Sequence, residues 1–368
     1  MVHLSTFSLL ATTASLVSAA PAILDARAGC TFTGAAGAAA LAKGKAACKL
    51  ITLSNLVVPA GQTLDLTKLA SGTKVIFQGT TTFGYEEWSG PLISVSGTNI
   101  DVSGATGNVI DGGGPKYWDG KGSNGGKVKP KFFAVHNVIS SSIENLNFKN
   151  SPVQLMSMLD CKNLQITNLR LDNSAGDAGK IGHNTDGIDV GSSTGITITG
   201  ANIHNQDDCI AINSGSDITF KNGICIGGHG ISIGSVGLRV NNAVKNVVID
   251  SSTVKDSDNG IRVKTISGAT GSVSGVTFSN IVLSNIHKTG IVVQQDYKNG
   301  SPTGTPTTGV PITGLTIKNI TGSVAAGATR VYILCGKGAC LNWAWAGVSF
   351  SGGTTAAKCL NLPGAAKC

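Results

Sequence analysis

One short sequence pattern recurs along the chain and limits the folds that it can adopt. In each copy apolar and polar residues alternate, a turn residue (Asn, Gly or Ser) follows, and a second apolar stretch ends at Asn or Asp. Full copies begin at Leu164, Ile196, Val247 and Val276, and partial copies begin at Ser141, Ile218 and Leu315, at intervals of 22 to 39 residues. A period of two is typical of half-buried strands, and no helix-length apolar period separates the copies. We therefore predict an all-β protein, a single parallel β-helix whose strands pair one coil apart.

The segment from Thr33 to Cys48 departs from this pattern. Its Ala-rich run is helix-prone despite two Gly residues. A solenoid has an open end whose strand edges need a cover. We expect a short N-terminal capping helix here, and we expect the C-terminal tail to cap the other end.

The first 27 residues have the composition of a targeting segment. Phe7 to Val17 form a short, mostly apolar run, and small residues follow it up to Ala20. We interpret residues 1–20 as a secretory signal peptide, residues 21–27 as a pro-segment and residues 28–368 as one β-helix domain. No stretch of 18 apolar residues occurs, so we expect no membrane span and a secreted, extracellular protein.

Nine cysteines in a secreted chain indicate disulfides and one unpaired thiol. Proximity in the sequence suggests four pairs: Cys30 with Cys48, Cys209 with Cys225, Cys335 with Cys340, and Cys359 with Cys368. Cys161 is left over, and a buried, inert thiol is the favoured interpretation over a nucleophile. The sequence has no C-x2-C spacing, so we expect no zinc site. Asn319, in Asn319-Ile-Thr321, is the expected glycosylation site.

The net charge of +8 allows a nucleic acid, an anionic membrane or an acidic polysaccharide as partner. The basic residues are scattered, without a Lys/Arg run or interleaved aromatics, so nucleic acid is the weaker interpretation.

Polar clusters interrupt the apolar pattern at intervals that match the coils. From Asp186 to Asp207 is 21 residues, from there to His229 is 22, to Arg262 another 33, and to Tyr297 another 35. Steps of about one coil stack side chains on one face of a β-helix, so these groups should converge. Two further charged residues accompany them: Asp208 follows Asp207, and Lys264 lies two positions after Arg262. Residues two positions apart on a strand point to the same side, so the side chains of Arg262 and Lys264 should project together.

These residue types favour glycoside hydrolysis of an anionic sugar. Paired carboxylates supply a general acid and an activated water, and like charges raise the pKa of the acid. Arg262 and Lys264 suit a substrate carboxylate, and the ring of Tyr297 suits stacking on a sugar. Each motif alone is more often a solvated turn or a wet strand face, but the shared register argues against that for the set. Three Asp residues could hold calcium, but two neighbouring cations would oppose it, so we expect neither metal nor cofactor.

At this point the chain resembles the fungal endopolygalacturonases of glycoside hydrolase family 28. The resemblance rests on Asn184-Thr185-Asp186, Gln206-Asp207-Asp208-Cys209, Gly227-Gly228-His229-Gly230, Arg262-Val263-Lys264 and Tyr297, in this order. It implies a right-handed β-helix that cleaves α-1,4-galacturonosyl bonds of polygalacturonate (pectin) with inversion.

The resemblance also implies the roles of the residues. Asp207 is the expected general acid, supported by His229, while Asp186 and Asp208 position and deprotonate the water. Arg262 and Lys264 would bind the substrate carboxylate, Tyr297 would line the adjacent subsite, and Asn184 would lie in the cleft. A monomer is expected, with plant inhibitor proteins as further partners.

Four alternatives remain at this stage. A rhamnogalacturonan hydrolase and an exo-acting enzyme are the nearest, and His229 with the Arg-x-Lys pair disfavours the former. A pectate lyase would need a calcium site beside a basic Arg. A non-catalytic solenoid that binds pectin is the alternative from another class, and it would have no need of a third carboxylate.

Overall fold

The computed structural model describes Met1 and residues 29–298, 300–364 and 366–368. The expected signal peptide beyond Met1 and the expected pro-segment lie outside these residues.

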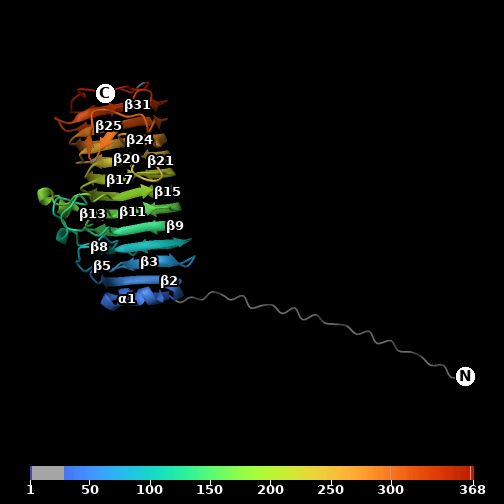
Figure 1. The fold of residues 1–368 in the computed structure, drawn as a ribbon. Helices are drawn as coiled ribbons and strands as arrows, with labels where there is room; N and C mark the ends of the chain where they lie inside the picture. The colour runs from blue at the N-terminus through green and yellow to red at the C-terminus, as the bar shows by residue number, and fades with distance from the viewer. Residues whose placement is uncertain (2–28, 299, 365) are drawn as a thin grey trace.

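The described chain is a parallel β-helix, in which coils stack from blue to red along one axis (Figure 1). Three faces run along the stack, and the long strands β2, β9 and β24 bend from one face into the next. The fold class expected from the sequence is confirmed.

Face 1 contains β3 (Leu64–Leu69), β6 (Ile93–Thr98), β9 (Phe133–Glu144), β11 (Met156–Leu159), β14 (Ile188–Gly191), β17 (Asp208–Ile212), β20 (Gly230–Val236), β23 (Asn259–Ile266), β25 (Thr289–Lys298) and β29 (Thr329–Leu334). Face 2 contains β1 (Gly29–Thr33), β2 (Leu50–Val58), β4 (Lys74–Gln78), β7 (Asp101–Gly104), the second half of β9, β12 (Lys162–Thr167), β15 (Ser193–Thr199), β18 (Gly215–Lys221), β21 (Ala243–Asp250), β24 (Ser272–Ile286), β27 (Ile312–Thr313), β28 (Thr316–Val324), β30 (Cys340–Leu341) and β31 (Ala344–Ser351).

Face 3 contains the end of β2, then β5 (Thr80–Phe83), β8 (Val109–Asp111), β10 (Asn147–Lys149), β13 (Arg170–Asp172), β16 (Asn202–Asn205), β19 (Ile224–Gly227) and β22 (Thr253–Lys255), and it continues through the ends of β24, β28 and β31. A short antiparallel strand, β26 (Ser301–Pro302), pairs with β25.

The sequence repeat corresponds to one register position of face 2. Ser141 pairs with Leu164, Leu164 with Ile196, and the series continues through Ile218 and Val247 to Val276. The side chains from Leu164 onward point into the solenoid and are at most 1% exposed. Each coil therefore buries its apolar residues against those of its neighbours, which stabilises the stack by the hydrophobic effect.

The N-terminal end of the stack is covered as expected. Helix α1 (Gly34–Gly44), followed by the helical turn η1 (Lys45–Ala47), lies across the first coil and buries Leu41. A Cβ at Gly37 would lie 2.6 Å from a methyl carbon of Leu56, so this glycine lets the helix approach the coil. The disulfide between Cys30 and Cys48 fastens the segment.

The other three disulfides also join the pairs that proximity suggested: Cys209–Cys225, Cys335–Cys340 and Cys359–Cys368. Cys161 is free and buried, and burial raises the pKa of its thiol. It is therefore poorly suited to act as a nucleophile.

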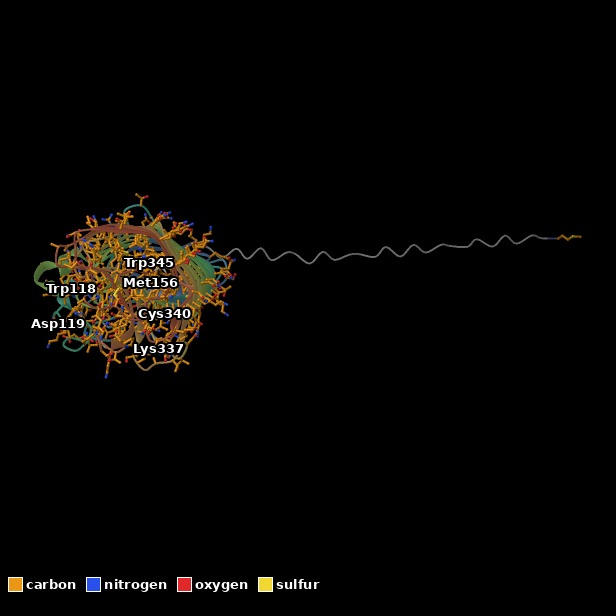
Figure 2. All side chains as sticks on the ribbon, turned by 90° about the horizontal axis from the view of Figure 1, so that it is seen from above. Trp118, Asp119, Met156, Lys337, Cys340 and Trp345 are labelled. Atoms are coloured by element: carbon orange, nitrogen blue, oxygen red, sulfur yellow. A yellow bond between two sulfur atoms is a disulfide. The ribbon has the colours of Figure 1, made fainter. Side chains whose placement is uncertain are left out.

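Two long connections project from the side of the stack. One contains the helical turn η2 (Gly114–Lys116), and the other contains η3 (Ser174–Gly176) and η4 (Ala178–Lys180) (Figure 1). Seen from above, Trp118 and Asp119 lie at the edge of the ring, away from the axis (Figure 2). None of the described helices is long and apolar enough to cross a membrane.

Candidate active site

The polar clusters meet on face 1, in successive coils. Asp186 comes two residues before β14, Asp207 and Asp208 lie at the start of β17, and His229 directly precedes β20. Asp208 pairs with Gly230, and Ser232 pairs with Arg262 on β23. These groups therefore lie on successive coils, as expected, but Arg262 aligns with Ser232 rather than with His229, and Tyr297 aligns with Ile266, so the register beyond His229 differs from the one counted in the sequence.

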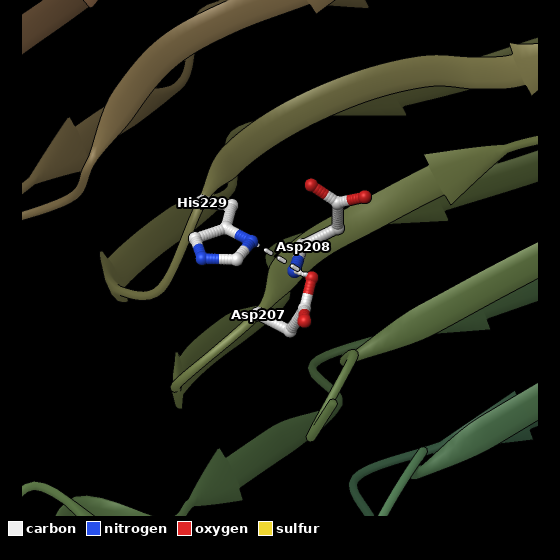
Figure 3. Close-up of side chains that lie close together, drawn as sticks. All are labelled: Asp207, Asp208 and His229. Atoms are coloured by element: carbon white, nitrogen blue, oxygen red, sulfur yellow. Dashed lines mark hydrogen bonds and ion pairs between the residues drawn. The ribbon is translucent and has the colours of Figure 1, made fainter. Parts of the chain in front are cut away.

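Asp207 and His229 form a hydrogen-bonded pair. His229 Nδ1 lies 2.9 Å from Asp207 Oδ1, and the imidazole turns toward this carboxylate, while the carboxylate of Asp208 points away from it (Figure 3). Asp207 Oδ1 also accepts the backbone N–H of Asp208 at 2.8 Å. Burial alone would raise the pKa of Asp207, but the hydrogen bond and the charge of His229 lower it far below the usual range. Burial disfavours the charged imidazole of His229 and would lower its pKa. The hydrogen bond to Asp207 and the charge of Asp207 outweigh this effect and raise the pKa of His229. The pair therefore favours an ionised Asp207 beside a protonated His229.

Asp208 faces the two expected substrate-binding cations. Lys264 Nζ donates to its Oδ2 at 2.6 Å, and Arg262 Nη1 lies 3.4 Å from its Oδ1. The hydroxyl of Ser232 donates to Oδ1 at 2.8 Å. The side chain of Lys264 is only 7% exposed and that of Arg262 only 11%. Both cations thus lie at the floor of the site, where they neutralise Asp208.

Asp186 has the opposite electrostatics to Asp207. Burial first, and then the charge of Asp207, raise its pKa well above the usual range. Asp189, which lies three residues further on β14, behaves in the same way: burial and then the charges of Asp208 and Asp207 raise its pKa to about 7. Carboxylates a few residues apart therefore hold their protons very differently, but in the free protein the raised pKa is on Asp186 and the lowered pKa on Asp207, the reverse of the expected base and acid roles.

Asn184 and Tyr297 border the cluster from opposite directions. Asn184 Nδ2 donates to Asp207 Oδ2 at 3.1 Å. The ring of Tyr297 lies near Lys264, whose Nζ is 5.4 Å from the ring centroid. Of the eight residues expected at the site, four lie on strands of face 1 (Asp208, Arg262, Lys264 and Tyr297), and the other four lie one to four residues before its strands (Asn184, Asp186, Asp207 and His229).

Two contributors, Asp258 and Asn205, were missed by the sequence reasoning. Asp258 Oδ2 lies 3.6 Å from His229 Nε2 and 2.7 Å from Nζ of Lys288, so His229 stands between two carboxylates. Buried Asn205 donates to the backbone oxygens of Thr185 and Asp208, both at 2.9 Å, and so ties two coils together. Both residues lie one coil from residues that the sequence had already selected; the backbone N–H of Asp258, for example, donates to the backbone oxygen of Gly228. This register was the signal in the sequence that could have identified them.

The cluster is poorly suited to a metal ion. One ligand atom from each of Asp207, Asp208 and His229 lies within 4.8 Å of the others. Lys264 already contacts Asp208, and the raised pKa of His229 favours its protonated form, which offers no lone pair.

The expected glycosylation site lies away from face 1. Asn319 is exposed on β28, and its Nδ2 donates to Oδ1 of Asn280 one coil below, at 3.1 Å. Asn280 in turn donates to Asp250, so the amide belongs to a ladder of polar side chains.

Comparisons with known proteins agree with this geometry. The chain is 60% identical over 368 residues to a polygalacturonase of Cochliobolus carbonum, with all of both chains covered. It is 62% identical over 366 residues to a polygalacturonase of Penicillium digitatum, with 98% of each chain covered.

A solved structure is similar as well. Endopolygalacturonase I from Stereum purpureum, complexed with two galacturonates, superposes with a TM-score of 0.80 at 38% sequence identity, over 89% of this chain and 95% of that one. The model of the glycosyl hydrolases family 28 matches residues 48–368. On the strength of this match and of the stacked carboxylates, the chain belongs to glycosyl hydrolase family 28.

Proposed function

We propose that this chain is an endo-acting polygalacturonase, which hydrolyses α-1,4-galacturonosyl bonds of polygalacturonate with inversion. The observation that carries the proposal is the cluster of Asp186, Asp207, Asp208 and His229 beside two cations, in a chain about 60% identical to polygalacturonases. The carboxylates would carry out the hydrolysis, and the cations would bind the carboxylate of an acidic sugar. A neutral polysaccharide would offer Arg262 and Lys264 no anion besides Asp208.

In the proposed mechanism Asp207 delivers a proton to the leaving oxygen. In the free enzyme the proton of the pair resides on His229, which is hydrogen-bonded to Asp207 Oδ1. As the substrate displaces water, a less polar surrounding favours transfer of this proton from Nδ1 to Asp207. Asp207 then protonates the glycosidic oxygen while the bond to the anomeric carbon breaks.

Asp186 and Asp208 would orient the attacking water and accept its proton. The raised pKa of Asp186 makes it a stronger proton acceptor once it is ionised. Asp208 is held by Ser232 and Lys264, so its carboxylate is fixed where a water between the two would bind. The water oxygen bonds to the anomeric carbon as the leaving group departs.

Arg262 and Lys264 would hold the galacturonate carboxylate next to the scissile bond. Because Asp208 engages both cations from one side, the substrate carboxylate would share them rather than bind free cations. Tyr297, beside Lys264, would offer its ring to the neighbouring sugar.

The purified protein on polygalacturonate provides the test. Endo action lowers viscosity early and yields mixed oligomers, whereas an exo enzyme releases mono- or dimers from the start. Because oxygens of Asp207 and Asp208 lie within 4.8 Å, shorter than the ~6.5–9.5 Å usual for inversion, stereochemistry needs its own measurement. Proton NMR of fresh product should show the β-anomer first, and an α-anomer would refute inversion. An absence of new reducing ends, with tight pectin binding, would favour the non-catalytic solenoid.

The processing and assembly of the chain belong to the same proposal. We propose secretion through a signal peptide over residues 1–20, removal of residues 21–27, and a monomeric catalytic domain from residue 28. The cationic surface and the matched relatives support an extracellular role, in which plant inhibitor proteins would be binding partners. N-terminal sequencing of the secreted product and sedimentation analysis test the boundaries and the monomer.

A further inference from the structure

Asp186 differs from the other carboxylates of the catalytic cluster in how it is held. Asp207 accepts hydrogen bonds at both of its oxygens, and Asp208 is held by Lys264 and Ser232. The side chain of Asp186, in contrast, makes no hydrogen bond or ion pair within the described residues. It also faces the charge of Asp207, which repels it once both groups are ionised. The position of Asp186 therefore depends on its backbone and on the residue that precedes it.

The residues directly before Asp186 and Asp207 bind each other through two hydrogen bonds. Thr185 Oγ1 accepts the backbone N–H of Gln206 at 2.9 Å and donates to Oε1 of the same residue, also at 2.9 Å. We call this reciprocal pair the Thr185–Gln206 clasp. Thr185 is 0% exposed, so its hydroxyl cannot contact a substrate. The clasp thus joins two successive coils at the point where each one presents a catalytic carboxyl group.

The side chain of Gln206 is itself held firmly by internal contacts. Its Nε2 donates to the backbone oxygen of Asn173 at 2.7 Å and to Asp177 Oδ1 at 2.8 Å. The connection that contains η3 and η4 packs closely against it, since a Cβ at Gly182 would lie only 2.5 Å from its Oε1. The amide of Gln206 is therefore fixed on both sides, and it offers Thr185 a rigid partner.

We propose that Thr185 and Gln206 are positioning residues, which set the distance between the carboxyl groups of Asp186 and Asp207. This inference rests on the proposed function, in which Asp207 protonates the leaving oxygen while Asp186 helps to orient the attacking water. Both events belong to one step, so both carboxyl groups must reach the same sugar at once. A displacement of about 1 Å can lower the rate of such a step by roughly 10²-fold. Each residue of the clasp acts only through the aspartate that follows it.

Thr185→Val tests the clasp, because it keeps the size of the side chain and removes the hydroxyl. At a temperature well below its Tm, kcat on polygalacturonate should fall by roughly 10- to 100-fold with little change in KM. Thr185→Ser retains the hydroxyl and should restore most of kcat. Thr81→Val is the matched control and should change neither constant, because Thr81 is also buried and its hydroxyl has no hydrogen-bond partner among the described residues.

Crystal structures of the unsubstituted protein and of the variants give a measurement that does not need cleavage. The distance between the carboxyl carbons of Asp186 and Asp207 should change by roughly 0.5 Å or more in Thr185→Val, the tolerance within which catalytic groups must be held. The same distance should stay unchanged in Thr185→Ser and in Thr81→Val. Gln206→Met keeps only the backbone half of the clasp, so it should change the distance and kcat in the same way but to a smaller extent.

The outcomes are distinct from those for the proposed function. An unchanged distance in Thr185→Val, an unchanged kcat, or a Thr185→Ser variant as slow as Thr185→Val would each overturn the role of the clasp. If the unsubstituted protein cleaves nothing, the proposed function fails, while the crystal structures still decide whether the clasp sets the distance. Where Thr185→Val does not fold, Gln206→Met decides the question by the same two measurements.

Discussion

Two rows of stacked side chains, built by the same geometry, have opposite roles in this molecule. The inner row of face 2 (Leu164, Ile196, Ile218, Val247 and Val276) is apolar and buried. The polar row of face 1 (Lys131, Gln154, Asp186 and Asp208) brings charges together, and burial and like charge raise the pKa of Asp186.

The comparison shows that a solenoid stacks the residues of one register position on each other, whether they are apolar or charged. Stacking apolar side chains gains stability in every coil. Stacking carboxylates costs stability unless cations or hydrogen bonds compensate, as Lys264 and Ser232 do for Asp208. Function therefore occupies the row that is the less favourable for folding.

The largest expected effect concerns the acid of the cluster. Asp207→Asn keeps the shape and the hydrogen bond acceptor but removes the transferable proton. The turnover rate should fall by at least ~10²–10⁴-fold, the contribution of one general acid. The initial rate of reducing-end release measures it, with circular dichroism as a check of the fold. Near-normal turnover in a folded variant would contradict the assignment.

Substitution in the inner row should affect stability and spare chemistry. Ile218→Ala removes buried methyl groups with no room for collapse between coils, and should cost about 2–5 kcal/mol of unfolding free energy. Denaturant titration measures the loss. Thr219→Ala, whose side chain points outward from the next position, is the control with a small expected effect. A large fall in turnover at low temperature, with little loss of stability, would show that the rows are not independent.

A cation below the site tests how charge on the substrate is recognised. Lys264→Met should lower kcat/KM on polygalacturonate by roughly 10- to 150-fold, the effect of one charge-assisted contact. Highly esterified pectin carries fewer free carboxylates, so kcat/KM on this substrate should fall less. The preference of the enzyme for polygalacturonate over esterified pectin should therefore become smaller. Equal losses on both would mean that Lys264 acts only through Asp208. Lys318→Met, at an exposed lysine of β28 on face 2, provides the comparison.

The smallest effect concerns the pH dependence of stability. Burial and neighbouring charges raise the pKa of Asp189 to about 7. Its unfolded form ionises near pH 4, so rising pH stabilises the unfolded chain first, and the folded state loses stability between about pH 4 and 7. His229 acts in the same direction, because its raised folded pKa stabilises below about pH 6.5 and this is lost as pH rises further.

Asp189→Asn should therefore flatten part of the fall in Tm between about pH 4 and 7. For each 1 kcal/mol of penalty that the substitution removes, Tm near pH 7 should rise by about 2–4 °C, the shift typical of domains of 150–250 residues. Asp160→Asn, at an exposed carboxylate near the end of β11, is the control. Parallel Tm curves for Asp189→Asn and the unsubstituted protein would mean that Asp189 ionises as freely as in the unfolded chain.

The sequence alone determined the periodic part of this protein. Its apolar repeat specifies the coils and the register of face 2, because side chains that alternate with period two can be buried on one side only. The same count brought Asp186, Asp207, Asp208 and His229 onto successive coils. The disulfide pairs followed from nearness along the chain.

Only the tertiary structure decided which groups touch within and beside the cluster. It placed Lys264 on Asp208 beneath the site, set Asp258 against His229, and folded the loop around Asp119 and Lys129 onto Asn184. These contacts depend on how far each side chain reaches and on connections whose lengths differ from coil to coil. A repeat fixes the position of a residue along the solenoid, whereas the proton on a carboxylate depends on its surroundings in all three dimensions.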